Sequence, residues 1–396
     1  MTFFVVFDTC THARYYGDVH QVLSLPEDAV IRYEYKRYLY TADAAAAIDS
    51  LMRDPSSLPV PALLMYGEKK GFVQGDAEPT TMLRVSDSVF VPTRSAQLVA
   101  VGVNSSANRK DDVLYLHFQL RGFVWPSAPV VDELVAALEA ANSLPWGDRD
   151  TQHKWISLLP AALEGKKGQL ISDQSTSWTQ VVDKFIDLPT QFAKDVFWRV
   201  QRVVEFKGGS PGANVPIEDR GSNERAHIDR WHRDYPLYEG KRYAVQIQTY
   251  SPAGHGVDVP QGATIAMTSK DDDDGILRLA SDPLDVVPNQ TEFKRFSIST
   301  DGALDSRYTG VHLEAQVPDR TSNYPAGGMC DLTFSIRKQR WRLGAGLLFI
   351  LAAAGMGAWV LAEKPNGWWS GGLTAGALLF TAVGGWLLTR QFKFGK

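Results

Sequence analysis

Two histidines and two aspartates lie within eight consecutive residues in the second half of the chain, at His227, Asp229, His232 and Asp234. Imidazole and carboxylate groups are the ligands that zinc and similar divalent ions prefer in proteins. The spacing argues against such a site, because residues five apart lie about 140° apart around a helix and on opposite faces of a strand. The histidines of a helical zinc site are separated by one full turn instead. We therefore favour a solvated loop with salt bridges, and we predict neither a metal nor a cofactor.

Four aspartates in a row precede Gly275, and a cluster of carboxylates can bind calcium. If Gly275 held the central glycine position of an EF-hand loop, Lys270 would take the first ligand position and Ser281 the last. Neither residue can serve there, because those positions require carboxylates. We predict instead that the Asp-Gly pair forms the turn of a β-hairpin.

The N-terminal segment offers one pairing for nucleophilic catalysis. Cys10 could be activated by His12 or His20, but only if the fold brought the thiol and an imidazole together. The glycines between Phe206 and Asn214 lack the Gly-Lys-Ser/Thr sequence of a phosphate-binding loop. We therefore expect a protein that is not an enzyme, and a membrane-tethered hydrolase is the least favoured alternative.

The richest combination of aromatic and basic residues lies in one short stretch near the N-terminus. Its members are Arg32, Tyr33, Tyr35, Lys36, Arg37 and Tyr38. Such rings can stack on a base while the cations bind its phosphates. The alternative is a strand that packs its tyrosines on the core and turns its charges outward, and we favour that alternative. If the N-terminal part binds a ligand, this stretch is the predicted site.

The elements that must position these residues are mainly strands. Residues 1–126 contain runs with the period of two that marks a half-buried strand, such as Ile31–Lys36, and predict a small β-rich, barrel-like domain. In residues 127–206 apolar residues recur at the spacing of a helix, which predicts a connector of moderate helicity. In residues 207–336 apolar and polar residues alternate again. This pattern predicts an antiparallel β-sandwich, which in the simplest interpretation is immunoglobulin-like. The last alternating residue is Ile336, so little slack separates this sandwich from the C-terminal segment of the chain.

Residues 337–396 hold two apolar segments, 343–362 and 368–388, and neither contains a charged residue. A helix rises about 1.5 Å per residue, so each segment reaches roughly the 30 Å thickness of a bilayer core. The short link between them contains Pro365 and Gly367 and predicts a tight hairpin. A buried hairpin of a soluble domain is the alternative, but a soluble helix normally keeps a polar stripe. We predict a two-helix transmembrane hairpin.

Basic residues flank the hairpin on one side. They precede the first segment at Arg337, Lys338, Arg340 and Arg342, and three more follow the second segment. The positive-inside rule then places both termini in the cytoplasm, at the inner membrane of the cell. Tryptophans fit two membrane interfaces: Trp341 and Trp386 at the inner one, and Trp359, Trp368 and Trp369 at the outer one. Met1–Asp8 lacks the features of a signal peptide, which agrees with a cytosolic body.

Small residues are frequent in both apolar segments, and Gly372 and Gly376 are four apart on one helix face. In lipid, small residues allow helices to approach closely, so we predict a homo-oligomer built through the hairpin. The chain carries a net charge of −4, although residues 337–396 are basic, so the body is acidic. An acidic body argues against nucleic acid as the main partner.

We therefore predict that the cytosolic β domains sense a ligand or partner and signal to an oligomerising membrane hairpin. The layout resembles that of two-helix membrane effectors in bacterial antiviral defence; the resemblance concerns layout and no motif carries it. A passive membrane scaffold for a cytosolic partner is the alternative. The sequence names neither the partner protein nor the small-molecule ligand, and it leaves open whether the hairpin forms a pore or only an anchor.

Overall fold

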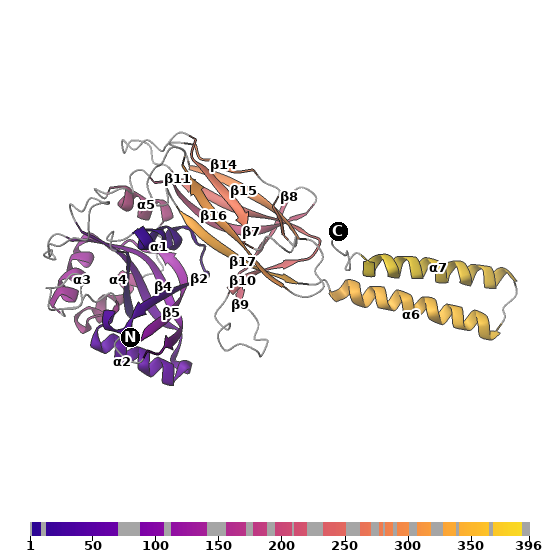
Figure 1. The fold of residues 1–396 in the computed structure, drawn as a ribbon, viewed down its shortest axis with the longest axis horizontal. Coiled ribbons are helices and arrows are strands. Elements are labelled where there is room, and N and C mark those ends of the chain that lie inside the picture. Colours follow the sequence, from indigo (N-terminus) through magenta and orange to yellow (C-terminus); the bar gives the residue numbers. More distant parts are fainter. Residues whose placement is uncertain are drawn as a thin grey trace.

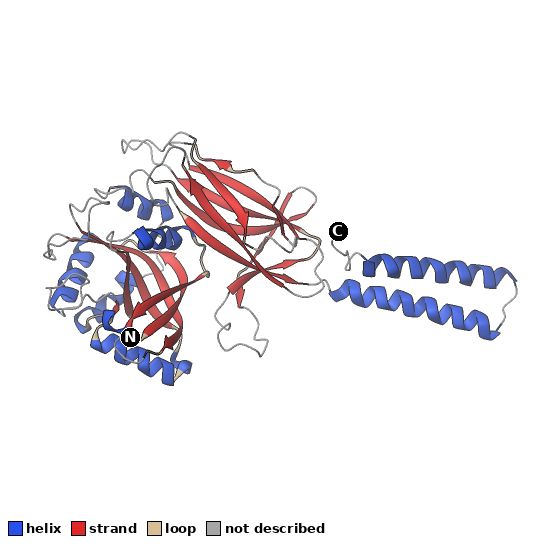
Figure 2. Cartoon of the chain, in the orientation of Figure 1, coloured by secondary structure: helices blue, strands red, loops and turns tan. Residues whose placement is uncertain are grey.

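The computed structural model of the protein describes residues 2–8, 13–69, 88–106, 112–140, 156–171, 177–187, 195–207, 210–219, 233–250, 262–270, 277–279, 282–287, 291–300, 307–317, 328–337, 340–363 and 367–389. Within these residues the fold is mainly β, with two long helices at the C-terminus (Figure 2). The prediction of a mainly β chain is therefore confirmed. The N-terminal part, a second part made of two sheets, which we call the sandwich, and the helix pair follow one another along the long axis of the molecule (Figure 1).

The N-terminal part is built on a six-stranded sheet with the order β2-β5-β4-β3-β1-β6. All neighbouring strands are antiparallel except β1 and β3, which are parallel. The strands are β1 (Phe3–Asp8), β2 (Val30–Lys36), β3 (Val60–Lys69), β4 (Ser88–Asn104), β5 (Val113–Phe123) and β6 (Ile156–Leu158). Beyond β2, Tyr40 forms an isolated bridge with Ile156, so the two edges of the sheet are joined at one point.

Helices accompany this sheet, and residues 1–126 contain two that the predicted β domain lacked. The helices of the N-terminal part are α1 (Ala13–Ser24), α2 (Ala42–Arg53), α3 (Ala128–Ala140), α4 (Lys167–Ile171) and α5 (Trp178–Ile186). Helix α2 begins where the Thr41 side chain accepts a hydrogen bond from the backbone of Ala44, and it buries Ala44, Ile48 and Leu51 on one face. Helix α5 begins with a capping box formed by Ser177 and Gln180.

Two further sheets form the second part, and each is antiparallel except where β10 and β17 run parallel. Their orders are β14-β12-β16-β17-β10-β9 and β13-β15-β11-β7-β8. The strands are β7 (Phe197–Lys207), β8 (Ser210–Val215), β9 (Glu218–Asp219), β10 (Arg233–Tyr238), β11 (Arg242–Tyr250), β12 (Thr264–Ser269), β13 (Leu277–Leu279), β14 (Leu284–Asp285), β15 (Thr291–Thr300), β16 (Arg307–Gln316) and β17 (Met329–Arg337). The immunoglobulin-like topology stays a prediction.

Alternating side chains build the core of this second part. On β17, Cys330, Leu332, Phe334 and Ile336 are buried while their neighbours are half-buried, as the period of two predicts. Inward residues of both sheets belong to one hydrophobic cluster, which also includes the core of the N-terminal sheet. The stretch predicted as a connector is divided: β6 joins the first sheet, while β7 starts at Phe197 and belongs to the sandwich.

The C-terminal helices α6 (Arg340–Glu363) and α7 (Gly367–Thr389) lie side by side and project away from the sheets (Figure 1). Phe349 and Phe380 stack between them, with ring centroids 5.3 Å apart. In α6, Gly344–Ala362 is long and apolar enough to cross a membrane, and its side chains are mostly exposed. The uninterrupted apolar run of α7, Gly371–Trp386, is shorter.

Candidate functional site: the junction between the N-terminal part and the sandwich

Helix α1 lies between the N-terminal sheet and the sandwich, where it contacts β1, β7 and β17. Helix α5 joins the same region, because its Asp183 carboxylate accepts a hydrogen bond of 2.8 Å from the Tyr250 hydroxyl on β11. The ring of Trp178 meets that of Tyr250 edge-on, with centroids 6.1 Å apart. We refer to the contacts of α1, α5 and the loop after α1 with the sandwich as the junction.

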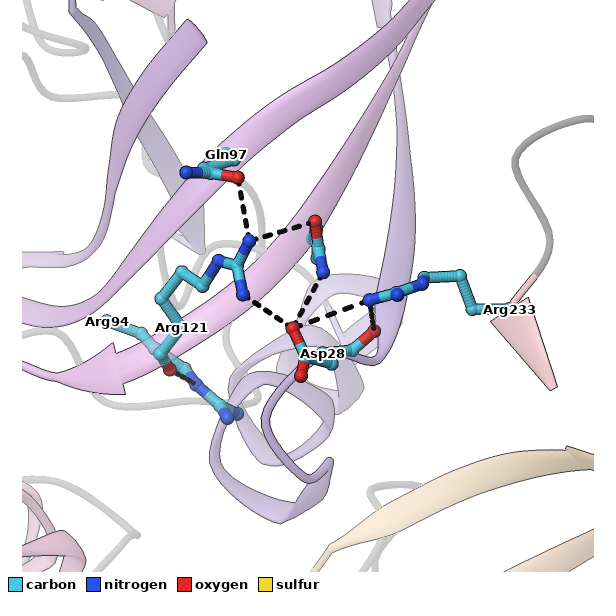
Figure 3. Close-up of polar contacts among 6 residues, drawn as sticks. Asp28, Arg94, Gln97, Arg121 and Arg233 are labelled. Carbon is cyan, nitrogen blue, oxygen red and sulfur yellow. Dashed lines mark hydrogen bonds and ion pairs between the residues drawn. The ribbon is translucent and has the colours of Figure 1, made fainter. Parts of the chain in front are cut away.

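Asp28 is the centre of a polar network at one side of the junction (Figure 3). It lies in the loop between α1 and β2 with φ 66°, a left-handed conformation that aspartate tolerates better than most residues. Its Oδ1 accepts hydrogen bonds from Gln119 Nε2 at 2.7 Å and Arg121 Nη1 at 2.5 Å. Arg233, on β10 of the sandwich, places Nη1 3.4 Å from the same oxygen and donates to the Asp28 carbonyl at 3.2 Å.

This network is half-exposed, which limits what it contributes to stability. The side chains of Asp28 and Arg121 are 44% and 37% exposed, and ion pairs of that kind contribute about 0–1 kcal/mol. Arg121 is held in place by Gln97, whose Oε1 accepts from Nη2 at 2.8 Å (Figure 3). The network therefore orients β10 against the N-terminal sheet more than it stabilises the fold.

Arg94, by contrast, is fully buried. Its Nη1 donates to the carbonyls of Val22 and Leu25, and its Nε to the carbonyl of Arg121, each at 2.7 Å. The last carbonyls of a helix lack partners within it, and a cation is favoured at that end, so Arg94 caps the C-terminus of α1. Burial lowers the pKa of Arg94 to about 9, and the charge of Glu27 opposes part of that shift.

A buried side-chain hydrogen bond joins α1 directly to the start of the sandwich. His20 Nε2 lies 2.9 Å from Asp195 Oδ2, and both side chains are at most 1% exposed. The imidazole also lies against the ring of Phe197, with centroids 5.6 Å apart. The sequence suggests His20 as a possible base for Cys10. The structure instead buries His20 with a carboxylate 175 residues away, while Cys10 and His12 lie outside the described residues.

The tightest contact of the junction is at Gly328, immediately before β17. The Ser24 hydroxyl donates to the Trp198 carbonyl at 2.8 Å, and the Trp198 indole donates to the Gly328 carbonyl at 3.1 Å. A Cβ at Gly328 would lie 2.6 Å from Ser24 Oγ and 2.9 Å from Trp198 Nε1. A side chain at this position would have to displace the Ser24 hydroxyl and the buried Trp198 ring. Strand β17 therefore starts in direct contact with the N-terminal part.

The predicted aromatic and basic stretch lies on β2 and the turn after it. Tyr33 and Tyr35 are 5% and 9% exposed, and Tyr33 packs against Phe118. Arg32 stacks on Tyr115 at 4.1 Å and pairs with Glu34, and both of its partners are in the same sheet. Lys36 lies 5.8 Å from the ring of Tyr38, and Arg37 pairs with Asp49 on α2. The tyrosines of β2 thus face the core, and its charges face outward.

The other predicted clusters fall largely outside the described residues. His227, Asp229 and His232 do so, as do the four aspartates before Gly275. Asp234 is buried on β10, opposite Glu218 of β9.

One motif escaped the sequence reasoning. Residues 208–212 read Gly-Gly-Ser-Pro-Gly, which matches the Gly-x-Ser-x-Gly pattern of a nucleophile elbow. That pattern requires a turn from strand to helix, whereas Ser210 begins the exposed edge strand β8. The motif therefore lacks the context in which its serine would be a nucleophile.

The residues predicted at the membrane lie at the end of β17 and on the helix pair. Arg337 ends β17 and pairs with Glu218 at 2.8 Å. Trp359, Trp368 and Trp386 are 45%, 95% and 55% exposed. Lys338 lies outside the described residues, and Arg340, Trp341, Arg342 and Trp369 are placed only as helical backbone.

The two glycines predicted for helix packing have different surroundings. A Cβ at Gly376 would meet Met356 Sδ of the same hairpin at 3.6 Å, whereas at Gly372 nothing lies within 4 Å. Of the described hairpin glycines, Gly384 has the least room for a side chain. There a Cβ would lie 2.9 Å from Ile350 Cγ1 and 3.0 Å from the Gly346 carbonyl. Sequence reasoning missed this position because glycine abundance does not tell which glycines face the partner helix.

Comparison with known proteins adds no functional information: no protein-family model and no curated protein matches the chain.

Proposed function

We propose that the protein is a non-enzymatic, membrane-anchored transducer. In this proposal the N-terminal part binds a ligand or partner, and the sandwich passes the resulting change to an oligomerising hairpin in the inner membrane. The observation that carries the proposal is the position of β17. This strand contacts α1 at Gly328, and only two residues separate its other end, at Arg337, from α6. A displacement of α1 against the sandwich would therefore act on the strand that leads into the membrane segment.

Strand β10 supplies a second mechanical connection. Arg233 at its start contacts Asp28 of the N-terminal part. Its end is in register with the last residues of β17, and the Glu239 amide donates to the Arg337 carbonyl at 3.1 Å. Hydrogen-bonded strands move as a unit more readily than loops do, so these contacts support coupling between the two ends of the molecule.

Both C-terminal helices cross the bilayer in this proposal. Helix α7 has 23 residues and at a rise of about 1.5 Å per residue is long enough to do so. Leucines at 348, 361, 378 and 379 are 65% exposed or more. Because both helices expose such large apolar side chains, the pair requires a lipid environment in this proposal. The basic residues before the first segment and after the second lie at the same end of the hairpin and favour cytoplasmic termini. Reporter fusions at Lys396 and at Pro365 should report opposite sides of the membrane; the same side for both would contradict this topology.

The transduction step can be tested without knowing the ligand. Gly328→Val forces a side chain between Ser24 and Trp198, and it should separate α1 from β17. We expect faster hydrogen exchange in α1 and β17 of the full chain in membranes, together with a changed fraction of crosslinked hairpin oligomers. Gly168→Ala on α4, where nothing lies within 4 Å of the new Cβ, is the matched control.

The two readouts together decide between a transducer and a scaffold. If hydrogen exchange shows that the junction has opened while the oligomers stay as in the wild type, the hairpin is insensitive to the junction. The passive scaffold would then be the better description.

A further inference from the structure

The sandwich sheet with the order β13-β15-β11-β7-β8 has an outward side that is rich in arginine. Side chains that alternate with buried ones along a strand point away from the core. On β15, Phe296 and Ile298 are buried, so Phe293, Arg295 and Ser297 point outward, and the strand register extends this side to the neighbouring strands. We call the outward side of this sheet the arginine face. Its exposed arginines are Arg202 on β7, Arg242 on β11, Arg278 on β13 and Arg295 on β15.

Strand pairing arranges these four arginines in two rows. In one row, Gln246 of β11 is paired with Arg295 on one side and with Arg202 on the other. Neighbouring strands lie about 4.8 Å apart, so the backbones of these two arginines are roughly 10 Å apart. In the other row, Ser299 of β15 separates the remaining two arginines in the same way. The rows are about 14 Å apart along the strands, so the four side chains share one patch.

No acid occupies an outward position that the structure describes on these five strands. The acids within the strands are Glu205 and Glu292, which are in register with the buried residues Tyr243 and Thr249 and so belong to the other side of the sheet. Each of them pairs with a lysine at 2.9 Å. The chain as a whole carries a net charge of −4, so this face is a local exception. Cations gathered without acids among them attract a polyanion.

The chemistry of the cations favours phosphate groups. A guanidinium group can donate two parallel hydrogen bonds to a phosphate, which a lysine ammonium group cannot do. Arg202 donates from Nε to Gln246 Oε1 at 2.6 Å. This bond fixes the plane of the guanidinium and does not use its two terminal nitrogens. The face therefore presents at least one arginine in a fixed orientation.

Aromatic rings lie on the same face. Phe293 points outward and is 64% exposed. The Arg295 guanidinium carbon lies 5.1 Å from the ring centroid of Phe206, which is half-buried on β7. Single-stranded nucleic acid is bound in this way on several β-sheets: exposed rings stack on bases, and cations contact the backbone phosphates. An acidic protein segment would have no such use for an exposed phenylalanine among arginines.

The arginine face extends along the sandwich, between the hairpin end and the N-terminal part (Figure 1). At the hairpin end, the Glu239 amide donates to the Arg337 carbonyl and the Gly240 amide donates to the Thr300 carbonyl. At the other end, Tyr250 of β11 contacts α5. A bilayer around the hairpin would reach one end of this face, whereas an extended strand of nucleic acid can cover its length.

We propose that the arginine face binds single-stranded nucleic acid. The four guanidinium groups contact its phosphates, and the ring of Phe293 stacks on a base. This surface belongs to the sandwich, so it is separate from the ligand site that the proposed function assigns to the N-terminal part. The acidic net charge of the body predicts the opposite, because an average over the whole chain hides one basic face.

The test uses the full chain in nanodiscs of neutral lipid, titrated with fluorescent oligothymidylate of about 20 nucleotides and followed by anisotropy. Each phosphate contact to a single strand contributes about −0.7 to the slope of log K against log salt, so four contacts predict a slope of roughly −3. The double variant Arg242→Gln with Arg295→Gln should bind about tenfold more weakly or less, with a slope smaller by about 1.4. Arg32→Gln, an exposed arginine on β2, is the matched control.

Phe293→Ala tests the stacking contact separately. It should weaken binding of oligothymidylate about fivefold or more and leave the salt slope unchanged, because no charge is removed. Oligoglutamate and vesicles of phosphatidylserine are the competing probes, and both should bind more weakly than oligothymidylate. Equal or tighter binding of either probe would assign the face to an acidic protein segment or to a lipid surface and would overturn the proposal.

Ultraviolet crosslinking of oligothymidylate to the wild-type protein provides a readout that does not depend on the folding of a variant. Mass spectrometry should recover the nucleotide on the peptide that contains Phe293. Crosslinks confined to the N-terminal part overturn the proposal, as do absence of binding at low salt and an equal loss of affinity in Arg32→Gln and the double variant. None of these readouts involves the junction or the oligomers, so the transducer proposal is tested separately.

Discussion

The junction and the hairpin both bring elements into close contact at glycines, but they do so to different extents. At the junction, Gly328 has no room for a methyl group, and the surrounding hydrogen bonds hold α1, β7 and β17 in one arrangement. In the hairpin, a Cβ at Gly384 would meet its nearest neighbour at 2.9 Å, against 2.6 Å at Gly328, whereas Gly372 has nothing within 4 Å. A packed contact specifies a single geometry, and an open small-residue face leaves a surface for another helix. In the proposed function, the packed junction would transmit a change and the open glycine face of the hairpin would respond by association.

The largest expected effect tests whether the junction depends on buried polar contacts. Arg94→Met removes the group that satisfies the carbonyls of Val22, Leu25 and Arg121. We expect the free energy of unfolding to fall by about 3–5 kcal/mol, because buried acceptors are left without donors. Chemical denaturation of the full chain in detergent measures it. Arg53→Met, on the exposed side of α2, is the control, and a similar loss in both variants would show that burial of Arg94 is irrelevant.

The second prediction separates contacts within one hairpin from contacts between hairpins. Gly384→Leu should push α6 and α7 apart, because a leucine there collides with Ile350 and the Gly346 carbonyl, at a cost of about 1–3 kcal/mol. Gly372→Leu should leave the hairpin intact and reduce only association between molecules.

Cysteine crosslinking distinguishes the two cases. A cysteine pair replacing the stacked Phe349 and Phe380 reports the contact within a hairpin, and crosslinked oligomers report the contact between hairpins. If both glycine variants lose the same crosslinks, the difference between an inner and an outer glycine face does not exist. The effect of Gly376→Leu, next to Met356, on the two kinds of crosslink should be intermediate between the effects of Gly384→Leu and Gly372→Leu.

A smaller effect is expected from the exposed network around Asp28. The double-mutant cycle of Asp28→Asn and Arg233→Ala should give a coupling free energy of about 0.5–1 kcal/mol that decreases with added salt. Asparagine tolerates the left-handed backbone at position 28, so only the charge is removed. The exposed pair Arg32–Glu34, within β2, is the comparison. A coupling near zero would leave His20, Ser24 and Gly328 as the contacts that define the junction.

The smallest effect is a pH dependence due to Lys184 on α5, whose pKa is lowered by burial. Its pKa is about 8 in the folded protein and near its usual, higher value when unfolded, so the unfolded chain binds more protons between these values. Stability of the wild type relative to Lys184→Met should therefore rise as the pH increases from about 8 to about 10.5, by an amount reduced by the partial exposure of Lys184. Melting temperatures across this range measure it, with Lys36→Met as control. A difference that falls with pH would have the wrong sign.

Local patterns in the sequence were sufficient for the elements that repeat. Alternation with a period of two identified β2 and β17, because side chains of a strand point to opposite faces regardless of which strand is its neighbour. The apolar run of α6 was equally evident from composition. Helix α2 was missed although its signals are local: the run of alanines after Thr41 favours a helix, and Thr41 caps it.

The sequence by itself therefore determined that the chain is mainly β and that it ends in apolar helices. Only the tertiary structure decided which residues meet at the junction. His20 and Asp195 are 175 residues apart, and Asp28 and Arg233 are 205 apart. No periodicity relates such residues, because their proximity depends on how α1 packs against both sheets. The same holds for Gly384: each helix alone is apolar on every side, and only the packing of α6 against α7 selects the face that excludes a side chain.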